Sequence, residues 1–263
     1  VTRDAVEQLR ARGIASLNAD ILFGLPDQNQ KRISDSVQML LSLSPDRVAL
    51  YGYAHVPWMA RRQAMIPTDS LPRPEERLEL FETARRLFKW DNYQDIGIDH
   101  FAKPDDGLAK AARTGHLRRN FQGYTDDTCD VLIGLGASAI SRFPQGFAQN
   151  ASGTADYQKA VRAGELATGR GHCFKGEDRL RARLIEALMC DFHINSAEIR
   201  RDFGVGDQQL EALYRTAEQA FPAMVTWESK GFHVRQDGRA LTRLIARAFD
   251  EYEMREEGHS SAI

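Results

Sequence analysis

Apolar and polar residues follow two different periods along the first half of the chain. Apolar residues that recur every three or four positions predict amphipathic helices over 2–13, 30–46 and 74–90. Short apolar runs bounded by glycine or proline predict strands over 17–26, 47–57, 93–102 and 129–141. Strands that alternate with helices of this length are typical of parallel βαβ units. The pattern therefore predicts an α/β fold.

The number of predicted strands indicates how complete this α/β part is. A closed eight-stranded α/β barrel takes about 250 residues, whereas residues 1–150 supply only about four strands. The first predicted element is a helix with no strand before it, and the bare edge of a parallel sheet exposes unpaired backbone groups. Residues 1–150 are therefore either an open sheet or part of a barrel, and we expect the chain to be the C-terminal part of a longer protein. A complete small α/β domain is the alternative.

Helical periodicity dominates the second half of the chain. Residues 142–174 are rich in glycine and predict a connection with one helix near 154–164. The rest predicts three helices, a hairpin and a closing helix, over 176–194, 195–205, 206–221, 224–236 and 238–253. This order is the outline of a winged helix. We therefore place a mostly helical, winged-helix-like domain at 151–263.

Charge changes what such a domain is expected to do. Residues 178–263 hold 12 Lys and Arg against 15 Asp and Glu, whereas a DNA-reading face is basic. We expect no nucleic-acid partner and interpret this part as a helical cap over a neighbouring site. The whole chain has a net charge of −2 and no apolar run near the roughly 20 residues of a membrane span, so no membrane partner is expected. Three widely separated cysteines, Cys129, Cys173 and Cys190, fit a cytoplasmic protein.

Candidate chemistry lies where the predicted parallel strands end, because ligands bind beyond those ends. Asp20 lies inside an apolar strand, which is costly unless its carboxylate faces a polar ligand or caps a neighbouring loop. His55, Asp99 and His100 follow two of the strands, and such ligands hold zinc or manganese in hydrolytic barrels. Each histidine can instead bond a loop carbonyl. A metal-dependent α/β-barrel hydrolase is therefore one hypothesis.

Basic loop residues predict a different ligand. Lys103, Arg118 and Arg119, with Arg61 and Arg62, are suited to a substrate that carries several carboxylates. The alternative is that they are solvated surface charges. The small residues of GLGASAIS (134–141) favour a flat ligand close to the backbone over a dinucleotide fingerprint.

Five motifs share their order and spacing with one known family. They are LNADILFGLP (17–26), YGYAHVP (51–57), GIDHFAKPDD (97–106), RRNFQGYT (118–125) and GLGASAIS (134–141). Through them the whole chain resembles the oxygen-independent coproporphyrinogen III oxidases of the radical S-adenosylmethionine superfamily. Related haem chaperones share the barrel and a GLG segment but not the pair HFAKPDD and RNFQGYT. A haem-binding protein on the same fold is therefore the nearest alternative.

The resemblance implies a reaction and its cofactors. The family oxidatively decarboxylates two propionates of coproporphyrinogen III to vinyl groups, giving protoporphyrinogen IX in haem biosynthesis. It uses a [4Fe-4S] cluster and two S-adenosylmethionine molecules, with an external electron donor and acceptor. The resemblance also implies that residues 1–150 are the C-terminal part of a partial TIM-like α/β barrel, followed by a mostly helical domain, and it leads us to expect a monomer.

The resemblance assigns roles to residues by motif. Asp20 and Ala54 match contacts to the second S-adenosylmethionine, and Ile140 matches a contact to the first. Arg118, Arg119, Gln122 and Tyr124 are the expected substrate contacts. The family's CxxxCxxC cluster loop is missing from these 263 residues, and the spacing of the three cysteines cannot replace it. We expect no metal ligand in this chain, the cluster ligands in a missing N-terminal part, and no activity from the chain alone.

Overall fold

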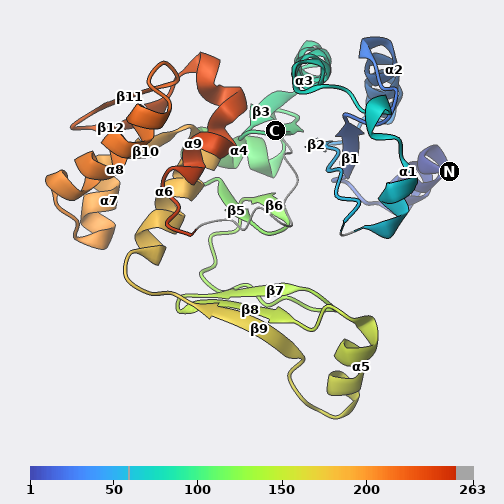
Figure 1. The fold of residues 1–263 in the computed structure, drawn as a ribbon. Coiled ribbons are helices and arrows are strands. Elements are labelled where there is room, and N and C mark those ends of the chain that lie inside the picture. Colours follow the sequence, from blue (N-terminus) through green and yellow to red (C-terminus); the bar gives the residue numbers. More distant parts are fainter. Residues whose placement is uncertain (59, 253–263) are drawn as a thin grey trace.

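Three parts follow one another along the chain (Figure 1). The computed structural model describes residues 1–58 and 60–252, and the side chain of Arg61 lies outside the description. An α/β part comes first, a small antiparallel sheet with one helix follows, and a mostly helical part ends the chain.

A βαβ unit forms the first part. Strands β1 (Asn18–Phe23) and β2 (Arg47–Gly52) pair in parallel and are joined by helix α2 (Gln30–Leu41). Helices α2 and α3 (Pro74–Trp90) pack together on one face of these strands, and their shared core includes Ile33, Val37, Val48, Leu80 and Phe88. Helix α1 (Thr2–Ala11) buries no residue. The three helices and two strands predicted here are confirmed: α3 has the predicted bounds, and the other elements are shorter than predicted.

Capping residues determine where two of these helices begin. The side chain of Asn29 accepts a hydrogen bond from the backbone nitrogen of Arg32 at 3.0 Å, which satisfies a donor in the first turn of α2. Pro74 occupies the first turn of α3, where the missing N–H of proline costs nothing, and the Glu76 carboxylate accepts from the Arg73 nitrogen at 2.7 Å. Between β2 and α3 lie two 3-10 turns, η1 (Arg61–Met65) and η2 (Thr68–Ser70).

The predicted strand over 93–102 is wrong, because the chain turns back on itself there. It forms a hairpin of β3 (Gln94–Ile96) and β4 (His100–Ala102), and Gly97 makes the turn with a φ of 55°. The sheet order is β1-β2-β4-β3, and β4 pairs with β2 in antiparallel fashion. Only β1 and β2 are therefore parallel, although the α/β class itself is confirmed.

The predicted strand over 129–141 is also wrong. After helix α4 (Gly107–Thr114) and the hairpin β5 (Arg118–Asn120) and β6 (Gly123–Thr125), the chain forms a loop until β7 (Ile140–Phe143). Positive φ angles at Gly136 and Ser138 prevent an extended strand. The Asn150 amide donates to the carbonyls of Gly134 and Gly136 at 3.1 and 2.9 Å, so this side chain helps to hold the loop.

Residues 142–174 are more regular than the connection that the sequence predicts. Strands β7, β8 (Gly146–Asn150) and β9 (Thr168–Cys173) form an antiparallel sheet, and helix α5 (Thr154–Arg162) confirms the helix predicted near 154–164. This sheet has strands on both sides of residue 150. The division of the chain into 1–150 and 151–263 stays a prediction.

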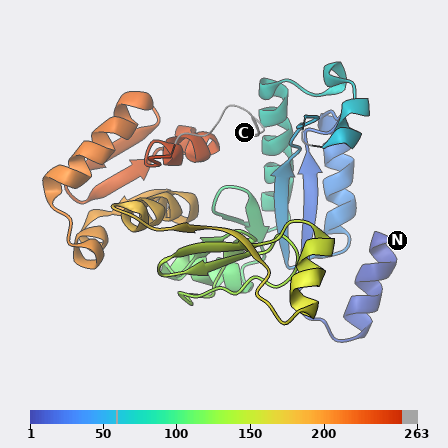
Figure 2. The ribbon, with the colours of Figure 1, turned by 60° about the horizontal axis from the view of Figure 1, so that its bottom comes forward.

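The last part has the order of elements of a winged helix. It runs through α6 (Asp178–Asp191), β10 (His193–Asn195), α7 (Ser196–Phe203), α8 (Asp207–Ala220), β11 (Val225–Glu228) and β12 (Gly231–Val234). The three helices and the hairpin predicted here are confirmed. The closing helix is shorter than predicted: a 3-10 turn η3 (Gln236–Leu241) leads into α9 (Thr242–Arg247), and residue 253 lies outside the described residues. Figure 2 shows this part facing helix α3 of the first part.

A small shared core connects the hairpins to the helical part. Ile96, Leu108, Leu117, Tyr124 and Cys190 pack together, and they come from β3, α4, β6, α6 and the segment before β5. The Tyr124 hydroxyl donates to the Met189 carbonyl at 2.8 Å and accepts from the Ile98 nitrogen at 3.0 Å. The β3–β4 turn is therefore fixed to α6 through one tyrosine.

Replacing Gly97 by alanine tests how closely Tyr124 packs against this turn. A Cβ at Gly97 would overlap the Tyr124 ring, and the positive φ adds strain. We expect Gly97→Ala to lower the free energy of unfolding by about 2–4 kcal/mol, measured by urea denaturation. Gly115→Ala is the matched control, because Gly115 has a φ of 71° but open space around its Cα. It should cost only about 1 kcal/mol, and equal losses in the two variants would contradict the close packing.

Candidate active site

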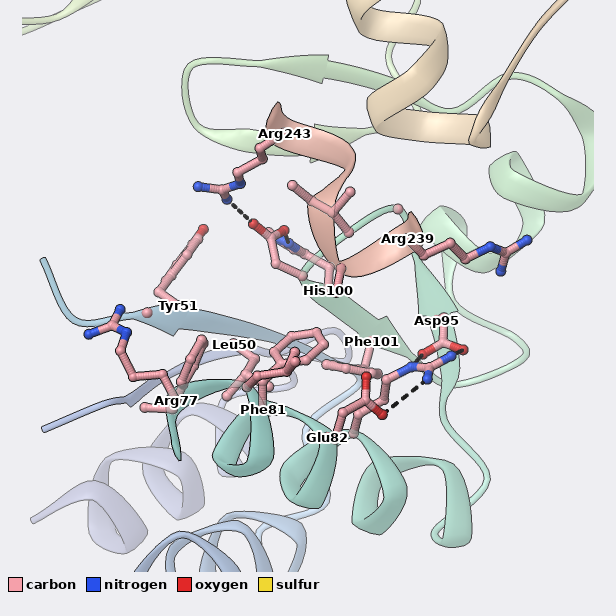
Figure 3. A pocket seen from close by; sticks show the side chains of 18 of the residues that line it. Leu50, Tyr51, Arg77, Phe81, Glu82, Asp95, His100, Phe101, Arg239 and Arg243 are labelled. Carbon is pink, nitrogen blue, oxygen red and sulfur yellow. Dashed lines mark hydrogen bonds and ion pairs between the residues drawn. The ribbon is translucent and has the colours of Figure 1, made fainter. Parts of the chain in front are cut away.

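A cavity of about 440 Å³ lies at the carboxyl ends of the two parallel strands (Figure 3). Phe23 and Gly52, the last residues of β1 and β2, line it together with α3 and the β3–β4 hairpin. The opposite wall is formed by Phe192, Arg239 and Arg243 of the helical part. The cavity lies where parallel α/β sheets bind ligands, and the helical part covers it, as the sequence predicts.

Asp99 connects the two walls of this cavity. It lies at the start of the second strand of the hairpin, and its Oδ1 atom is 2.6 Å from His100 Nδ1. Its other oxygen accepts a hydrogen bond from the guanidinium of Arg243, a residue of α9 (Figure 3). The side chains of Asp99 and His100 are only 8% and 7% exposed. A carboxylate buried this deeply is stable only with such partners.

The partners of Asp99 also decide its ionisation. Burial disfavours the charged carboxylate, but the hydrogen bond from His100 and the positive charges of His100, Arg119 and Arg243 outweigh it. The net effect holds the pKa of Asp99 below its ordinary value. The carboxylate is therefore ionised at neutral pH.

His100 presents its second ring nitrogen to the interior of the site. Because Nδ1 is engaged by Asp99, Nε2 is the ring nitrogen left for other partners: it donates when the imidazole is charged and accepts when the imidazole is neutral. The ring contacts Tyr51 and Tyr124 edge-on, with centroids 5.8 and 4.9 Å away. A Cβ on Gly123 would lie 3.1 Å from Nε2 and 3.8 Å from the Tyr51 hydroxyl, so this glycine leaves space beside both groups. The arrangement can accept a proton or orient a polar ligand atom.

The pKa of the Tyr51 hydroxyl depends on burial and on the charges around it. Burial is the largest cause that raises the pKa of its hydroxyl, and the negative charges of Asp20 and Asp99 raise it further. Arg119 and Arg243 oppose this shift. The phenol therefore stays protonated at neutral pH and remains a hydrogen-bond donor.

The predicted substrate contacts separate into two groups. The Arg119 guanidinium lies 5.0 Å from the centroid of the Tyr124 ring, and its Nη1 atom is buried without a hydrogen-bond partner among the described residues. Tyr124 adjoins His100, but its hydroxyl is engaged in the two backbone hydrogen bonds given above. Arg118 donates to the Leu117 carbonyl at 2.9 Å, and Gln122 is exposed in the β5–β6 turn. The roles of these four residues stay predictions.

The three predicted cofactor contacts lie on separate elements. Asp20 on β1 is exposed, and its carboxylate accepts a hydrogen bond from the Asn18 amide at 2.7 Å. In the sheet, Asp20 pairs with Ala49 of β2, and Ala49 pairs with His100 of β4. Paired residues share a face of a sheet, so Asp20 and His100 lie on the same face. The Ala54 carbonyl accepts from the Gln63 amide at 3.1 Å. Ile140 is the first residue of β7. Its backbone lies so close to Gly134 that a Cβ added to Gly134 would be 2.8 Å from the Ile140 carbonyl.

Lys103 does not join this site. Because β4 runs antiparallel to β2, Lys103 lies at the beginning of β2, where its Nζ donates to the Ser44 carbonyl at 3.0 Å. The hypothesis that Lys103 helps to bind the polyanion at the strand ends is therefore wrong. Arg62 is exposed in η1, and the side chain of Arg61 lies outside the described part.

The proposed metal set does not form either. His55 Nδ1 lies 3.4 Å from the Tyr53 hydroxyl. Over residues 1–58 and 60–252, no group of three or more His, Cys, Asp or Glu residues is placed to hold a metal ion. Cys129 and Cys173 are exposed and Cys190 is buried. His55, Asp99 and His100 therefore do not support the hydrolase hypothesis, and the described residues do not fit an iron–sulfur cluster.

Sequence reasoning missed three residues that line the cavity. Tyr51 lies within YGYAHVP, so its position at a strand end was a usable signal. Arg77 on α3 and Arg243 on α9 lie on helices whose apolar period says nothing about what their arginines contact. The partner of Arg243 is 144 residues away in the chain.

The fold identifies the class of protein. Coproporphyrinogen III oxidase (HemN) from Escherichia coli, described as a radical SAM enzyme, matches the structure with a TM-score of 0.88 and 33% sequence identity. The match covers 96% of this chain and 58% of the other. This chain therefore has the fold of part of a radical S-adenosylmethionine enzyme, as its motifs predict.

The sequence comparisons specify the relatives. The chain is 59% identical over 263 residues to the oxygen-independent coproporphyrinogen III oxidase of Paracoccus denitrificans, covering 100% of this chain and 58% of the relative. It is 56% identical over 253 residues to that of Cereibacter sphaeroides, covering 96% of this chain and 56% of the relative. No protein-family model matches. The resemblance inferred from the motifs is confirmed, and the chain spans under three fifths of the length of these relatives.

The match to the solved structure also bears on cofactors. The radical SAM match implies S-adenosylmethionine and an iron–sulfur cluster at the level of the fold family. Among the described residues, no helix is both long and apolar enough to cross a membrane.

Replacing Asp99 by asparagine tests the charge at this site. We expect Asp99→Asn to lower the free energy of unfolding at pH 7 by about 1.5–3 kcal/mol, because two charge-assisted hydrogen bonds weaken. The folded-state pKa of Asp99 is lowered, so its stabilisation is present above the unfolded value of about 3.9 and is lost as pH falls through the folded value. Urea denaturation at pH 7 and pH 3 should therefore show a smaller difference between wild type and variant at pH 3.

Asp105→Asn is the control for this comparison. Asp105 is exposed in the loop between β4 and α4, so its loss should change stability by less than about 0.5 kcal/mol at either pH. An Asp99→Asn difference that stays constant between the two pH values would show that the carboxylate charge does not stabilise the fold.

Proposed function

We propose that this chain is the substrate-facing part of an oxygen-independent coproporphyrinogen III oxidase. The observation that carries the proposal is the match of 95–100% of the chain to proteins of that name, at up to 59% identity. The proposed reaction converts two propionates of coproporphyrinogen III to vinyl groups and gives protoporphyrinogen IX. Each propionate loses one hydrogen atom and carbon dioxide, and an external acceptor receives the one electron that remains.

The cavity supplies what a reactive substrate arm needs. Such chemistry requires that water be excluded and that one carbon be held in register. Phe23, Leu50, Phe81 and Phe101 form apolar walls, and Arg243 fixes the helical part against Asp99. Arg119, whose Nη1 has no described partner, and Tyr51 are available to bind substrate carboxylates on the same side as His100. Arg118, Gln122 and Tyr124 complete the proposed substrate loop.

The described residues fit S-adenosylmethionine better than the cluster. The exposed carboxylate of Asp20 is suited to ligand hydroxyl or ammonium groups, and Ala54 has a small side chain that lets a ligand approach. We propose that Asp20 and Ala54 contact a second S-adenosylmethionine and Ile140 a first. When bound, S-adenosylmethionine supplies the one-electron chemistry that removes a hydrogen atom from the substrate. We further propose a cytoplasmic monomer with an external electron donor, in which 1–150 and 151–263 act as barrel part and cap.

A chimera tests the proposed function. This chain would replace the matching segment of the Escherichia coli enzyme, and the purified, reconstituted chimera would receive coproporphyrinogen III without oxygen. We expect protoporphyrinogen IX, detected as porphyrin fluorescence after oxidation. Circular dichroism and cleavage of S-adenosylmethionine serve as controls for folding and cofactor loading.

Two outcomes would reject the proposal. A folded chimera that cleaves S-adenosylmethionine but leaves coproporphyrinogen III unchanged would show that this chain does not present the substrate. Tight stoichiometric binding of haem by the same chimera, without decarboxylation, would instead favour a haem-binding function.

A further inference from the structure

Arg77 carries a guanidinium that the described residues use only in part. Its Nη1 atom donates to the Tyr53 carbonyl at 3.0 Å, and its Cζ atom lies 5.7 Å from the centroid of the Phe23 ring. Its Nη2 atom is buried and has no hydrogen-bond partner among the described residues. Burial lowers the pKa of Arg77, and no described carboxylate opposes this effect. A buried charged donor without an acceptor is costly, so a ligand oxygen would stabilise it.

The backbone holds this guanidinium in place. Gly24, directly after β1, has a φ of 79°, and a Cβ at that position would lie 2.8 Å from Arg77 Nη1. The missing side chain therefore provides the space into which Arg77 fits. With the carbonyl of Tyr53 on its other side, Arg77 is positioned by the ends of both parallel strands.

The acidic residues nearby are engaged elsewhere. Arg85 binds Asp95 at 2.9 Å and Glu82 at 3.4 Å, and Figure 3 shows this group on the other side of the cavity from Arg77. Asp99 is paired with His100 and Arg243. Among residues 1–58 and 60–252, no carboxylate forms a hydrogen bond or ion pair with Arg77, so a ligand carboxylate would supply the missing acceptor.

The rest of the cavity indicates the shape of that ligand. Its apolar lining residues include Leu50, Leu78, Phe81, Ile98 and Phe101. A volume of about 440 Å³ is near the lower end of the roughly 300–1,000 Å³ of small-molecule pockets. An arm that ends in a carboxylate, attached to one flat ring, suits this volume better than a complete tetrapyrrole.

We propose that this cavity binds one propionate arm and its pyrrole ring from the tetrapyrrole substrate, with Arg77 as the anchor for the carboxylate. The carboxylate accepts from Arg77 Nη2, and the pyrrole lies against Phe81 and Leu50. The other arms extend toward the face of the sheet that carries His100 and Asp20. The carboxylate site rests on the geometry of Arg77, whereas its assignment to a tetrapyrrole rests on the proposed function.

Binding of coproporphyrin III, a stable oxidised form of the substrate, tests this subsite in the 263-residue chain. The probes are coproporphyrin III and its tetramethyl ester, titrated by fluorescence. We expect Arg77→Met to weaken coproporphyrin III binding about 10–100-fold, the range for one charge-assisted hydrogen-bond site. Arg77→Lys should recover part of the loss, and the ester should bind wild type and Arg77→Met equally weakly. Arg86→Met is the matched control, because Arg86 is exposed on the same helix, and it should bind like wild type.

Three results would overturn the subsite. They are equal affinity of wild type and Arg77→Met for coproporphyrin III, equal affinity of wild type for acid and ester, and displacement of coproporphyrin III by S-adenosylmethionine from this cavity. The last result would assign the carboxylate to the cofactor instead of the substrate.

The same variant in the chimera separates this inference from the proposed function. Arg77→Met should raise the KM for coproporphyrinogen III about 10-fold or more and change kcat less. A chimera that forms protoporphyrinogen IX with an unchanged KM in the variant would reject the subsite and retain the function. A chimera inert toward coproporphyrinogen III, whose coproporphyrin III binding still depends on Arg77, would reject the function and retain the carboxylate subsite.

Discussion

A buried carboxylate holds the candidate site together. Asp99 is almost fully removed from solvent, and an ionised group in such a place needs opposite charge and hydrogen bonds. One partner, His100, follows it directly, and the other, Arg243, comes from the last described helix. Because the charge of Asp99 is satisfied only when α9 lies over the hairpin, the position of the helical part and the electrostatics of the site are coupled.

The rest of the site follows from this coupling. With its Nδ1 atom engaged by Asp99, His100 turns Nε2 toward the space beside Gly123 and Tyr51. Tyr124 holds the β3–β4 turn in place, because its hydroxyl accepts from the Ile98 nitrogen and donates to the Met189 carbonyl. The wall that carries Arg239 and Arg243 then closes the cavity opposite α3. A substrate arm in this cavity would be held between two parts of the chain, so binding and closure would support each other.

The sequence predicts the helices well because their apolar periods are long and their ends carry clear signals, such as Asn29 and Pro74. The prediction fails at 93–102, because the short apolar run indicates one strand, whereas the chain turns at Gly97, which has a positive φ. Because of that error, Lys103 was expected at the carboxyl ends of the parallel strands, whereas it lies at the beginning of β2. The prediction also fails at 129–141, where positive φ angles at Gly136 and Ser138 interrupt the extended backbone. Arg77 and Arg243 could not be recognised, because their role depends on contacts between distant segments rather than on local pattern.

A double-mutant cycle on Asp99 and Arg243 measures the coupling most directly. The free energy of unfolding would be determined for wild type, Asp99→Asn, Arg243→Met and the double variant by urea denaturation at pH 7. The ion pair predicts that the two losses are not additive, with an interaction free energy of about 1 kcal/mol or more. Additive losses would contradict the claim that Asp99 fixes the helical part over the site.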